Sequence, residues 1–516
     1  MFIEAGALTR CRHRLHLDSV IPELVADLPE DTGVRQRKEA ATVFREQVRS
    51  DLGGGVRIDP ALDTAGRAAG TLAACAAGAE RIWGAVLPPE PDTGRRGHAE
   101  FLQRDADRGG YIPVIVVNHK VTDPRSGAAA PEDPIPRTSP MDRWAPAADP
   151  SRRARSHLRD QLRLAQLYRM LQRHGLASPA LVGGVIGLGF DRILAHDLTN
   201  VLAEYDMRFA DRIAIVRGEL DTLPVRVPEC RSCPWWARCR GQLTEQRDVS
   251  MVAPGARADV LRAEGVRTVD ALATWTGAPP RDWQFGDFAD AVRTARAWLQ
   301  SIPIMRRVES VSIKRADVEV DVDLESFQEH GAYLWGTLVD GVYRPFVTWD
   351  PLPTVDEARS FAEFWRWLME LLAETLAAGR TFAAYCYSRA AEDKWLYDSA
   401  RRFAGRPGVP TVEEIRTFVD GPHWVDVYQA VSDQFLSANG KGLKKIAPFA
   451  GFAWRDPEAS GEASMEWYKL AVGYDGAPDL VQRRRILQYN EDDVLATRAV
   501  RNWISTEAAR VPYLPQ

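Results

Sequence analysis

The C-terminal half of this chain contains the stretch Val320-Asp-Val-Asp-Leu-Glu325, which places carboxylates at every second position near the end of an apolar run. Alternation of this kind predicts a β-strand, in which Asp323 and Glu325 point to the same face of the sheet. Oxygen ligands suit Mg2+, so the pair indicates a divalent cation site. Two alternatives remain: a solvated strand end, and a shifted register that pairs Asp321 with Asp323.

Further candidate residues follow in the same half. Residues 382–388 predict a second strand, and Glu392 begins the helix after it. In Tyr489-Asn-Glu-Asp-Asp493 the tyrosine and the last aspartate are four residues apart, so they are neighbours on one face of a helix predicted over 479–507. Asp492 is expected to be solvated. Each motif is weak alone, and their order along the chain is what makes them informative.

In this order the motifs resemble the DEDD exonucleases of the RNase H-like fold, in particular their tyrosine subclass. The resemblance implies that four carboxylates hold two Mg2+ or Mn2+ ions and that Tyr489 orients the attacking water. Two ions suit phosphodiester hydrolysis, because one generates hydroxide while the other stabilises the leaving oxygen. The subclass usually has Asp at the second motif, where this chain has Glu392. The four carboxylates are Asp323, Glu325, Glu392 and Asp493.

Three of the six cysteines lie within ten residues, in Cys230-Arg-Ser-Cys233-Pro-Trp-Trp-Ala-Arg-Cys239. This spacing allows three thiolates to face one metal centre and leaves one of four ligand positions open. We expect Cys11 to fill it, because Cys11 lies among charged residues and the other two cysteines lie in apolar stretches. An exposed N-terminal thiol is the alternative for Cys11.

One cysteine before a nuclease core and three after it resemble the iron-sulfur nucleases of the RecB-like PD-(D/E)XK class. The resemblance implies a 4Fe-4S cluster bound by these four cysteines. Structural Zn2+ is the alternative, since four thiolates also suit that ion.

The same class uses an acidic residue before a strand and then an Asp or Glu two positions ahead of a Lys. Glu100 and Lys120 fit this pattern, but the acidic position is Asn118, whose neutral amide is a poor ligand for a hard cation. A histidine of the class is replaced by Phe44, and its Q-x3-Y element is imperfect at Tyr168. We therefore expect weak or no nuclease activity here, and a role in DNA binding or scaffolding.

Two features favour a nucleic-acid substrate. Gly440-Lys-Gly-Leu-Lys-Lys445 gathers Lys441, Lys444 and Lys445 in a glycine-containing segment that suits phosphate contact, with a solvated loop and helix start as the alternative. Residues 252–273 predict two short helices separated by Gly265. They resemble a helix-hairpin-helix that would offer backbone amides to a phosphate, or form a plain αα-hairpin.

A chain of 516 residues is too long for one hydrophobic core. We predict an α/β multidomain protein with an iron-sulfur nuclease-like domain over 1–245, a hairpin linker over 246–304 and an RNase H-like domain over 305–516. Residues 1–110 are predicted to be mostly helical, and 121–150, with seven prolines, a long exposed or partly disordered insertion. This order resembles a bacterial family of RecB-like nucleases with a C-terminal RNase H-like domain.

The net charge of -5 gives no overall signature of nucleic-acid binding, so such a function depends on local patches. Apolar runs fall short of the roughly 20 residues of a membrane helix, and no secretory signal is visible, so a cytoplasmic protein is expected. The sequence thus predicts a 3'-to-5' DNA exonuclease for DNA repair or processing, whose helicase or repair partner it does not identify. An RNA exonuclease and a non-catalytic nucleic-acid-binding scaffold are the alternatives.

Overall fold

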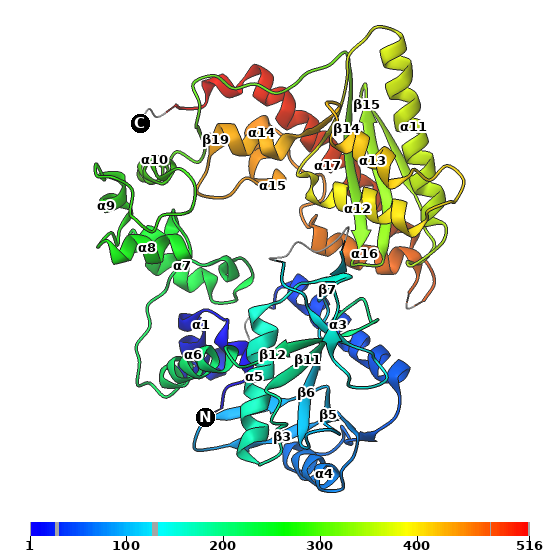
Figure 1. Cartoon of the computed structure of the whole chain (residues 1–516). Coiled ribbons are helices and arrows are strands. Elements are labelled where there is room, and N and C mark those ends of the chain that lie inside the picture. The colour runs from blue at the N-terminus through cyan, green and yellow to red at the C-terminus, as the bar shows by residue number, and fades with distance from the viewer. Residues whose placement is uncertain (1, 26–29, 126–132, 475, 514–516) are drawn as a thin grey trace. The chain divides into compact units, whose positions relative to one another are not determined.

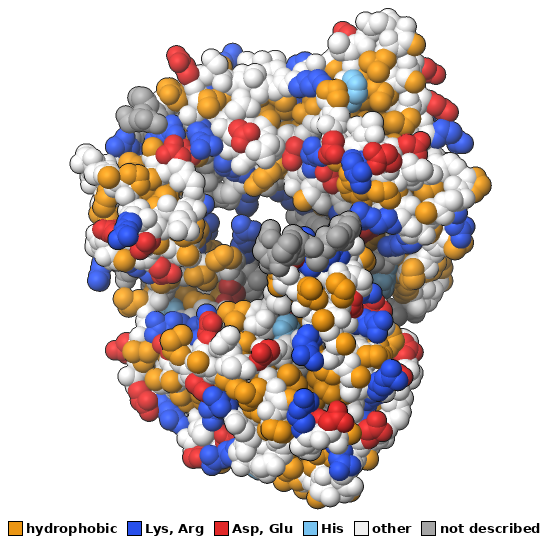
Figure 2. Space-filling model, in the orientation of Figure 1, with side chains coloured by type: hydrophobic (Ala, Val, Ile, Leu, Met, Phe, Trp, Pro, Cys, Tyr) orange, Lys and Arg blue, Asp and Glu red, His pale blue; other side chains and the backbone are white. Residues whose placement is uncertain are grey.

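The structure is a computed structural model that describes residues 2–25, 30–125, 133–474 and 476–513 (Figure 1). It comprises two compact units, Met1–Glu245 and Gln246–Gln516. The expected linker, 246–304, falls within the second unit. On the face drawn in Figure 2, acidic and basic side chains are interspersed over each unit. Among the described residues, no helix combines the length and apolar composition needed to cross a membrane.

An eight-stranded sheet forms the centre of the first unit, in the order β1-β2-β5-β6-β11-β12-β8-β9. Strand β6 is buried throughout, and its alternate side chains face two separate apolar cores. Val114 and Val116 pack with the helix α3 (Thr32–Leu52) on one face, while Ile115 packs with α5 (Leu158–Arg173) and α6 (Val201–Val216) on the other. The strands are β1 (Val56–Arg57), β2 (Arg81–Trp83), β5 (Phe101–Arg104), β6 (Tyr111–Val116), β11 (Val182–Ile186), β12 (Ile193–Asp197), β8 (Arg137–Ser139) and β9 (Ala147–Ala148).

The prediction that residues 1–110 are mostly helical is wrong after α4 (Thr64–Ala76), where β2, β3 (Val86–Glu90), β4 (Arg95–His98) and β5 follow one another. These strands have three to five residues each, so they are too short to display an alternation of apolar and polar residues. The alanine-rich helix before them therefore dominates the sequence signal. The insertion predicted over 121–150 contains β7 (Thr122–Pro124), β8 and β9, with β8 paired to β12 and β9 to β8. Its residues 126–132 lie outside the described part of the chain.

The second unit begins with short helices, as predicted for 252–273. They are α8 (Ala256–Ala263) and α9 (Val269–Ala273), and Gly265 turns the chain between them with a φ of +80°. Arg262 of α8 pairs with Asp248 at 2.7 Å and so ties the hairpin to the segment before it. The helix α10 (Phe288–Leu299) and the strand β13 (Met305–Arg306), which pairs with β19 (Phe435–Leu436), lead into the rest of the unit.

A five-stranded mixed sheet follows, in the order β16-β15-β14-β17-β18. The central strand β14 (Val318–Phe327) is antiparallel to β15 (Gly331–Val339) and parallel to β17 (Phe382–Cys386). β16 (Val342–Val347) and β18 (Trp424–Asp426) are the edges. The strands predicted from about 318 to 348 are confirmed, and the strand predicted over 382–388 is present and ends at Cys386. Each contains at least two β-branched or aromatic residues, which favour strands.

Helices cover both faces of this sheet (Figure 1). Phe382, Ala384 and Cys386 of β17 pack in the core with α11, α12 and α13, whereas Ala383 and Tyr385 pack in the core with α14 and α17. Burial of this kind stabilises by roughly 1.5–3 kcal/mol for each large apolar side chain. The helices are α11 (Glu357–Ala377), α12 (Arg389–Arg402), α13 (Val412–Val419), α14 (Val427–Gln434), α15 (Leu443–Ile446), α16 (Gly461–Val472) and α17 (Leu480–Thr506).

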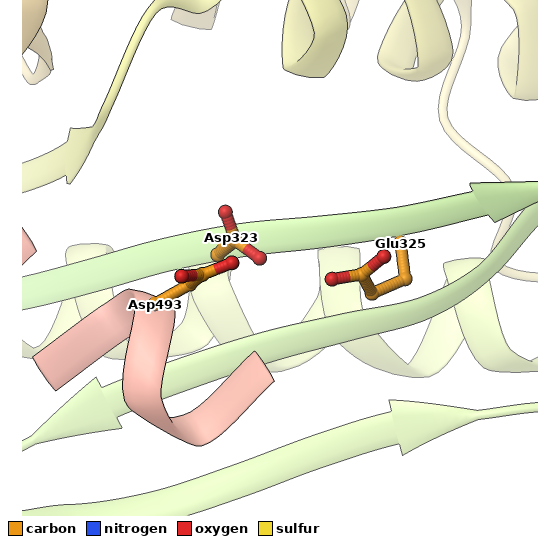
Figure 3. A group of neighbouring side chains, drawn as sticks. All are labelled: Asp323, Glu325 and Asp493. Atoms are coloured by element: carbon orange, nitrogen blue, oxygen red, sulfur yellow. The ribbon is translucent and has the colours of Figure 1, made fainter. Parts of the chain in front are cut away.

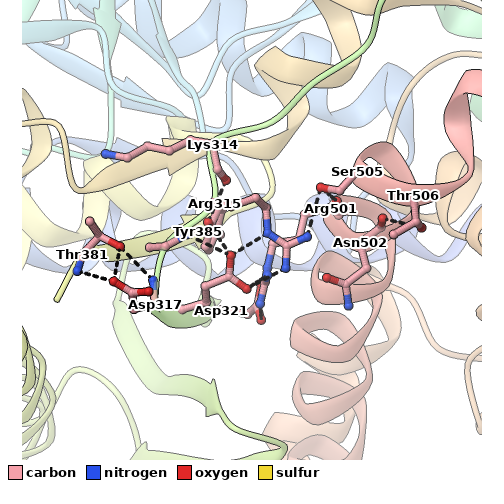
Figure 4. Close-up of polar contacts among 12 residues, drawn as sticks. Lys314, Arg315, Asp317, Asp321, Thr381, Tyr385, Arg501, Asn502, Ser505 and Thr506 are labelled. Atoms are coloured by element: carbon pink, nitrogen blue, oxygen red, sulfur yellow. Dashed lines mark hydrogen bonds and ion pairs between the residues drawn. The ribbon is translucent and has the colours of Figure 1, made fainter.

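A buried ion pair joins α17 to β14 (Figure 4). The guanidinium of Arg501 donates through Nε and Nη2 to the two carboxylate oxygens of Asp321, at 2.8 and 2.9 Å. It also pairs with Glu319 and lies 4.5 Å from the ring centroid of Tyr385 on β17. Because bidentate geometry tolerates little sliding, this pair fixes how the long helix lies along the strand.

Candidate metal centre

Three carboxylates converge where α17 crosses β14 (Figure 3). Asp323 and Glu325 come from the strand and Asp493 from the helix, and one oxygen of each lies within 4.8 Å of the others. Among the described residues, this three-carboxylate group is the only set of three or more metal-ligating side chains that meets this distance. Converging oxygens at this separation could hold a divalent cation.

The backbone around the group explains its geometry. Asp323 lies opposite Gly336 of β15, and a side chain added at Gly336 would place its Cβ 1.6 Å from Oδ1 of Asn490. Glycine at this position therefore lets α17 approach the sheet closely enough for Asp493 to reach the strand. The strand pairing shifts between Glu325 and Ser326, which marks a β-bulge at the edge of the group.

Three neutral donors hold the three carboxylates. Asn490 Nδ2 donates to Asp323 Oδ2 at 2.8 Å. Ser464 Oγ donates to Glu325 Oε2 at 3.0 Å, and Trp454 Nε1 donates to Asp493 Oδ1 at 2.7 Å. The sequence does not predict these donors. Asn490 follows Tyr489 directly in the motif Tyr489-Asn-Glu-Asp-Asp493, whereas no spacing marks Ser464 or Trp454.

The electrostatics of the group favour the uptake of positive charge. Burial and the neighbouring Asp493 raise the pKa of Glu325 to about 8. Burial raises the pKa of Asp493 to about 6, and burial with the Asp493 and Glu325 charges raises the pKa of Asp323 well above its usual range. Each carboxylate is thus costly to ionise without a counter-ion, and a bound cation would remove that cost.

Glu392 and Tyr489 lie next to the group. Glu392, near the start of α12, is 4% exposed, and one of its carboxylate oxygens has no hydrogen-bond partner within the described structure. Burial and the nearby Asp393 raise its pKa to about 8. It interacts electrostatically with Asp323 and Glu325 without belonging to the three-carboxylate group. The buried Tyr489 hydroxyl hydrogen-bonds to Asp493.

A family model described as RNase_H superfamily matches residues 372–505. The C-terminal unit contains an RNase H-like domain. The matched residues include Glu392, Tyr489 and Asp493 and begin after the strand that carries Asp323 and Glu325. Neither the curated proteins nor the solved structures gave a match to this chain. The match supports a hydrolase of the nuclease type that uses divalent metals, and hence a nucleic-acid substrate.

Two other aspartates of the second unit bind arginine side chains instead. Asp321, the alternative partner of Asp323, is fully buried against Arg501 and lies outside the three-carboxylate group. The expectation that Asp492 is solvated is wrong, because it is 2% exposed and accepts from Arg455 Nε at 2.6 Å. On α17 its side chain is directed to the segment before α16, whereas Asp493 faces the strand.

The three predicted phosphate-binding lysines lie in different surroundings. Lys441 is half-buried, and its Nζ donates to the Ser432 carbonyl at 2.8 Å. Lys445 is exposed. Lys444 is exposed too, yet its Nζ lies 4.9 Å from the Tyr489 ring centroid and 5.3 Å from that of Trp454. Of the three, Lys444 alone is therefore placed beside the three-carboxylate group.

In the first unit, two arginines and a backbone amide bind the carboxylate of Glu100. Its Oε1 pairs with Arg45 at 3.0 Å and with Arg163 at 2.9 Å, and its Oε2 accepts from the Val116 amide at 3.1 Å. Against the effect of burial, Arg163 and Arg45 lower the pKa of Glu100. Asn118 and Lys120 follow the end of β6 on either side of His119, whose Nε2 lies 2.9 Å from Asp160.

Phe44 and Tyr168, where this chain departs from the nuclease class, have structural roles. Phe44 packs in the apolar core beneath α3. Tyr168 donates its hydroxyl proton to the Ser178 carbonyl at 2.7 Å. Phe44 thus contributes apolar packing, and Tyr168 contributes a hydrogen bond to the backbone.

The N-terminal cysteine lies with the other three. Cys11 precedes α1 (Arg12–Val20), and its amide donates to Glu229 at 2.7 Å, next to Cys230. Trp235 Nε1 donates to Asp18 of α1 at 2.7 Å, which holds that helix against the segment before α7 (Trp236–Glu245). Burial, then Cys233, Cys11 and Cys230, raise the pKa of Cys239 to about 11. All four are free thiols.

Proposed function

We propose that this protein is a Mg2+- or Mn2+-dependent 3'-to-5' exonuclease that hydrolyses DNA in repair or processing in the cytoplasm. The observation that carries the proposal is the three-carboxylate group, which gathers Asp323, Glu325 and Asp493 within 4.8 Å in a unit with an RNase H-like domain. The proposed domain extends from 305 to 516, since β14 supplies two of the ligands. Exonuclease polarity follows from the resemblance to the tyrosine subclass of DEDD enzymes.

Each side chain has a proposed role. Asp323, Glu325 and Asp493 bind the divalent ions, with Glu392 as the fourth carboxylate through its unpartnered buried oxygen. Bound divalent ions would polarise the attacking water and the phosphate oxygens. The Tyr489 hydroxyl, fixed by its hydrogen bond to Asp493, would orient that water. Asn490, Ser464 and Trp454 keep the carboxylates in place through the hydrogen bonds described above.

A degradation assay tests this function. DNA and RNA strands labelled at either end are incubated with the purified protein and Mg2+ or Mn2+, and the products are sized over time. We expect stepwise loss of nucleotides from the 3' end of DNA, abolished by Asp493→Ala. Asp420→Asn, an exposed substitution at the end of α13, is the matched control and should retain activity.

Other outcomes of this assay separate the alternatives. Degradation of RNA alone would assign an RNA exonuclease. Binding of DNA without release of nucleotides in any divalent metal would contradict hydrolysis and favour a nucleic-acid-binding scaffold. Full activity in Asp493→Ala would place the chemistry outside the RNase H-like domain.

We further propose that the first unit is a PD-(D/E)XK-like domain whose own nuclease site has lapsed. Arg45 and Arg163 supply the positive charge that a metal ion would otherwise bring to Glu100, and Asn118 offers no charge to such an ion. Lys120 is the third residue of this lapsed site. The expected role of the unit is DNA binding or scaffolding, and residues 246–304 would link it to the exonuclease domain.

In the same unit we propose a 4Fe-4S cluster bound by Cys11, Cys230, Cys233 and Cys239. All four thiols are free, and Cys11, Cys230 and Cys233 act electrostatically on Cys239. Structural Zn2+ is the alternative, since four thiolates also suit that ion. Such a centre would brace α1 against the segment 228–239.

Anaerobically purified protein tests the cluster. A broad absorbance near about 400 nm, typical of thiolate-bound iron-sulfur centres, should be present and should be lost in Cys11→Ser. Cys75→Ser, at a buried cysteine of α4, is the control and should retain the absorbance. Colourless protein with one zinc ion per chain would contradict the iron assignment.

A further inference from the structure

Lys444 occupies a position that the proposed roles leave unexplained. It belongs to α15, a single turn anchored by Ile446, which is fully buried against α14 and α17. Because Ile446 is only two residues from Lys444, its burial fixes the position of the Lys444 backbone. The side chain itself is exposed, so a ligand from solvent can reach its ammonium group.

The ammonium group faces the two rings that position Asp493. Its Nζ lies 4.9 Å from the ring centroid of Tyr489 and 5.3 Å from that of Trp454. Both rings carry a polar atom that hydrogen-bonds to Asp493. A cation over aromatic faces is stabilised without being neutralised, so it keeps its charge for another anion.

The hydrogen bonding of Lys444 also leaves its ammonium group able to bind an anion. Its Nζ donates to the Ala459 carbonyl, and within the described residues it makes no ion pair with a carboxylate. Carboxylates that act on it at longer range are Asp493, Glu325, Glu462 and Asp456. In turn, its charge opposes the rise in pKa of Glu325 and Asp493. An ammonium has three donors, so two remain.

We propose that Lys444 is a further catalytic residue, whose ammonium group binds a non-bridging oxygen of the scissile phosphate when the strand end lies on the three-carboxylate group. This inference rests on the proposed nuclease function and adds a residue to its site. Negative charge on the transferred phosphoryl group must be stabilised as the phosphodiester bond breaks, and a fixed cation stabilises it without reorganisation. Lys441 and Lys445 do not share this position, so their contribution is limited to the strand away from the reacting bond.

Steady-state kinetics of variants test the proposal on the labelled strand that the wild-type protein degrades. Lys444→Met should lower kcat by about 10²-fold, the usual loss for removing one charge-stabilising donor. Lys444→Arg restores the charge and should keep kcat within about tenfold of wild type. Lys445→Met, one position along the same turn, should raise KM and leave kcat within about threefold.

The split between kcat and KM separates a catalytic role from one in strand binding alone. Lys444→Met should lower kcat, whereas Lys445→Met should raise KM. Far-UV circular dichroism and the Mn2+-induced rise in Tm check that each variant is folded, and Lys444→Gln replaces the methionine variant if that one is not.

Two results overturn the inference while leaving the nuclease function intact. They are a kcat in Lys444→Met no lower than in Lys445→Met, and a Lys444→Arg variant as slow as Lys444→Met. A wild-type protein that cleaves no strand with any divalent metal would instead refute the proposed function, and this inference with it.

Discussion

Replacing Glu325 by Gln should stabilise the metal-free protein at alkaline pH, although it removes a proposed metal ligand. The carboxyl of Glu325 has a folded-state pKa of about 8, against an ordinary value of 4.5. The unfolded chain therefore releases this proton near the ordinary value, and the folded state loses stability as the pH rises from there to about 8.

The size of the effect follows from these two values. Each pKa unit corresponds to about 1.4 kcal/mol, so above pH 8 the free energy of unfolding is lower by about 5 kcal/mol. We expect Glu325→Gln to recover ~2 kcal/mol of this loss. Recovery is partial because burying the amide also costs free energy, although its oxygen can still accept a hydrogen bond from Ser464. Well below pH 4.5 both states are protonated, so the gain should vanish there.

Urea unfolding followed by tryptophan fluorescence, in EDTA at about pH 5 and about pH 8.5, measures the gain. Mn2+ should stabilise the wild-type protein at the higher pH and have much less effect on the variant. Glu319→Gln, on the same strand, is the control of opposite sign. Despite the effect of burial, Arg315 and Arg501 lower the pKa of Glu319 to about 2, so its removal should destabilise the protein at both pH values.

An equal gain for Glu325→Gln at both pH values, or a loss at the higher one, would refute the reasoning. The first result would mean that the substitution acts through packing. The second would mean that the carboxylate is already stabilised by protein groups, which would weaken the case for a cation.

Three further predictions follow from the same contacts. Gly336→Ala should abolish metal-dependent activity and cost ~2 kcal/mol or more in unfolding experiments, because its Cβ would displace Asn490, whereas Gly442→Ala meets no atom within 4 Å and should do neither. Arg501→Met should cost about 3–5 kcal/mol in urea unfolding, since it leaves Asp321 buried and unpaired, and Arg501→Met combined with Asp321→Asn should recover part of that loss. Mn2+ affinity measured by calorimetry should rise between about pH 6 and pH 8 and level off above, because the ion must displace protons from the three-carboxylate group.

The main elements of the C-terminal site could be predicted because their sequence signals are local. Alternation along ten residues marks β14, and spacing along a 27-residue helix places Tyr489 and Asp493 on one face. These signals place the candidate metal ligands on the correct elements. They also determine which face of the strand the carboxylates occupy, since the side-chain period of a strand is fixed.

The partners of these residues could not be predicted, because they are brought in by packing between distant segments. Ser464 is 139 residues from Glu325 and reaches it only through the packing of α16 on the sheet. The mostly helical prediction for residues 1–110 failed for a different reason. Strands of three to five residues, separated by glycines and prolines, carry too few positions for a period of two to emerge.

The helix α17 carries Tyr489, Asn490, Asp493 and Arg501 within four turns. A displacement of this one element would move three groups at the same time: the proposed water-orienting hydroxyl of Tyr489, the Asn490 amide that holds Asp323, and Asp493, a proposed metal ligand. The ion pair between Arg501 and Asp321 holds this helix on β14 and so opposes such a displacement. Loss of that ion pair would therefore disturb all three groups at the same time, although Arg501 touches none of them.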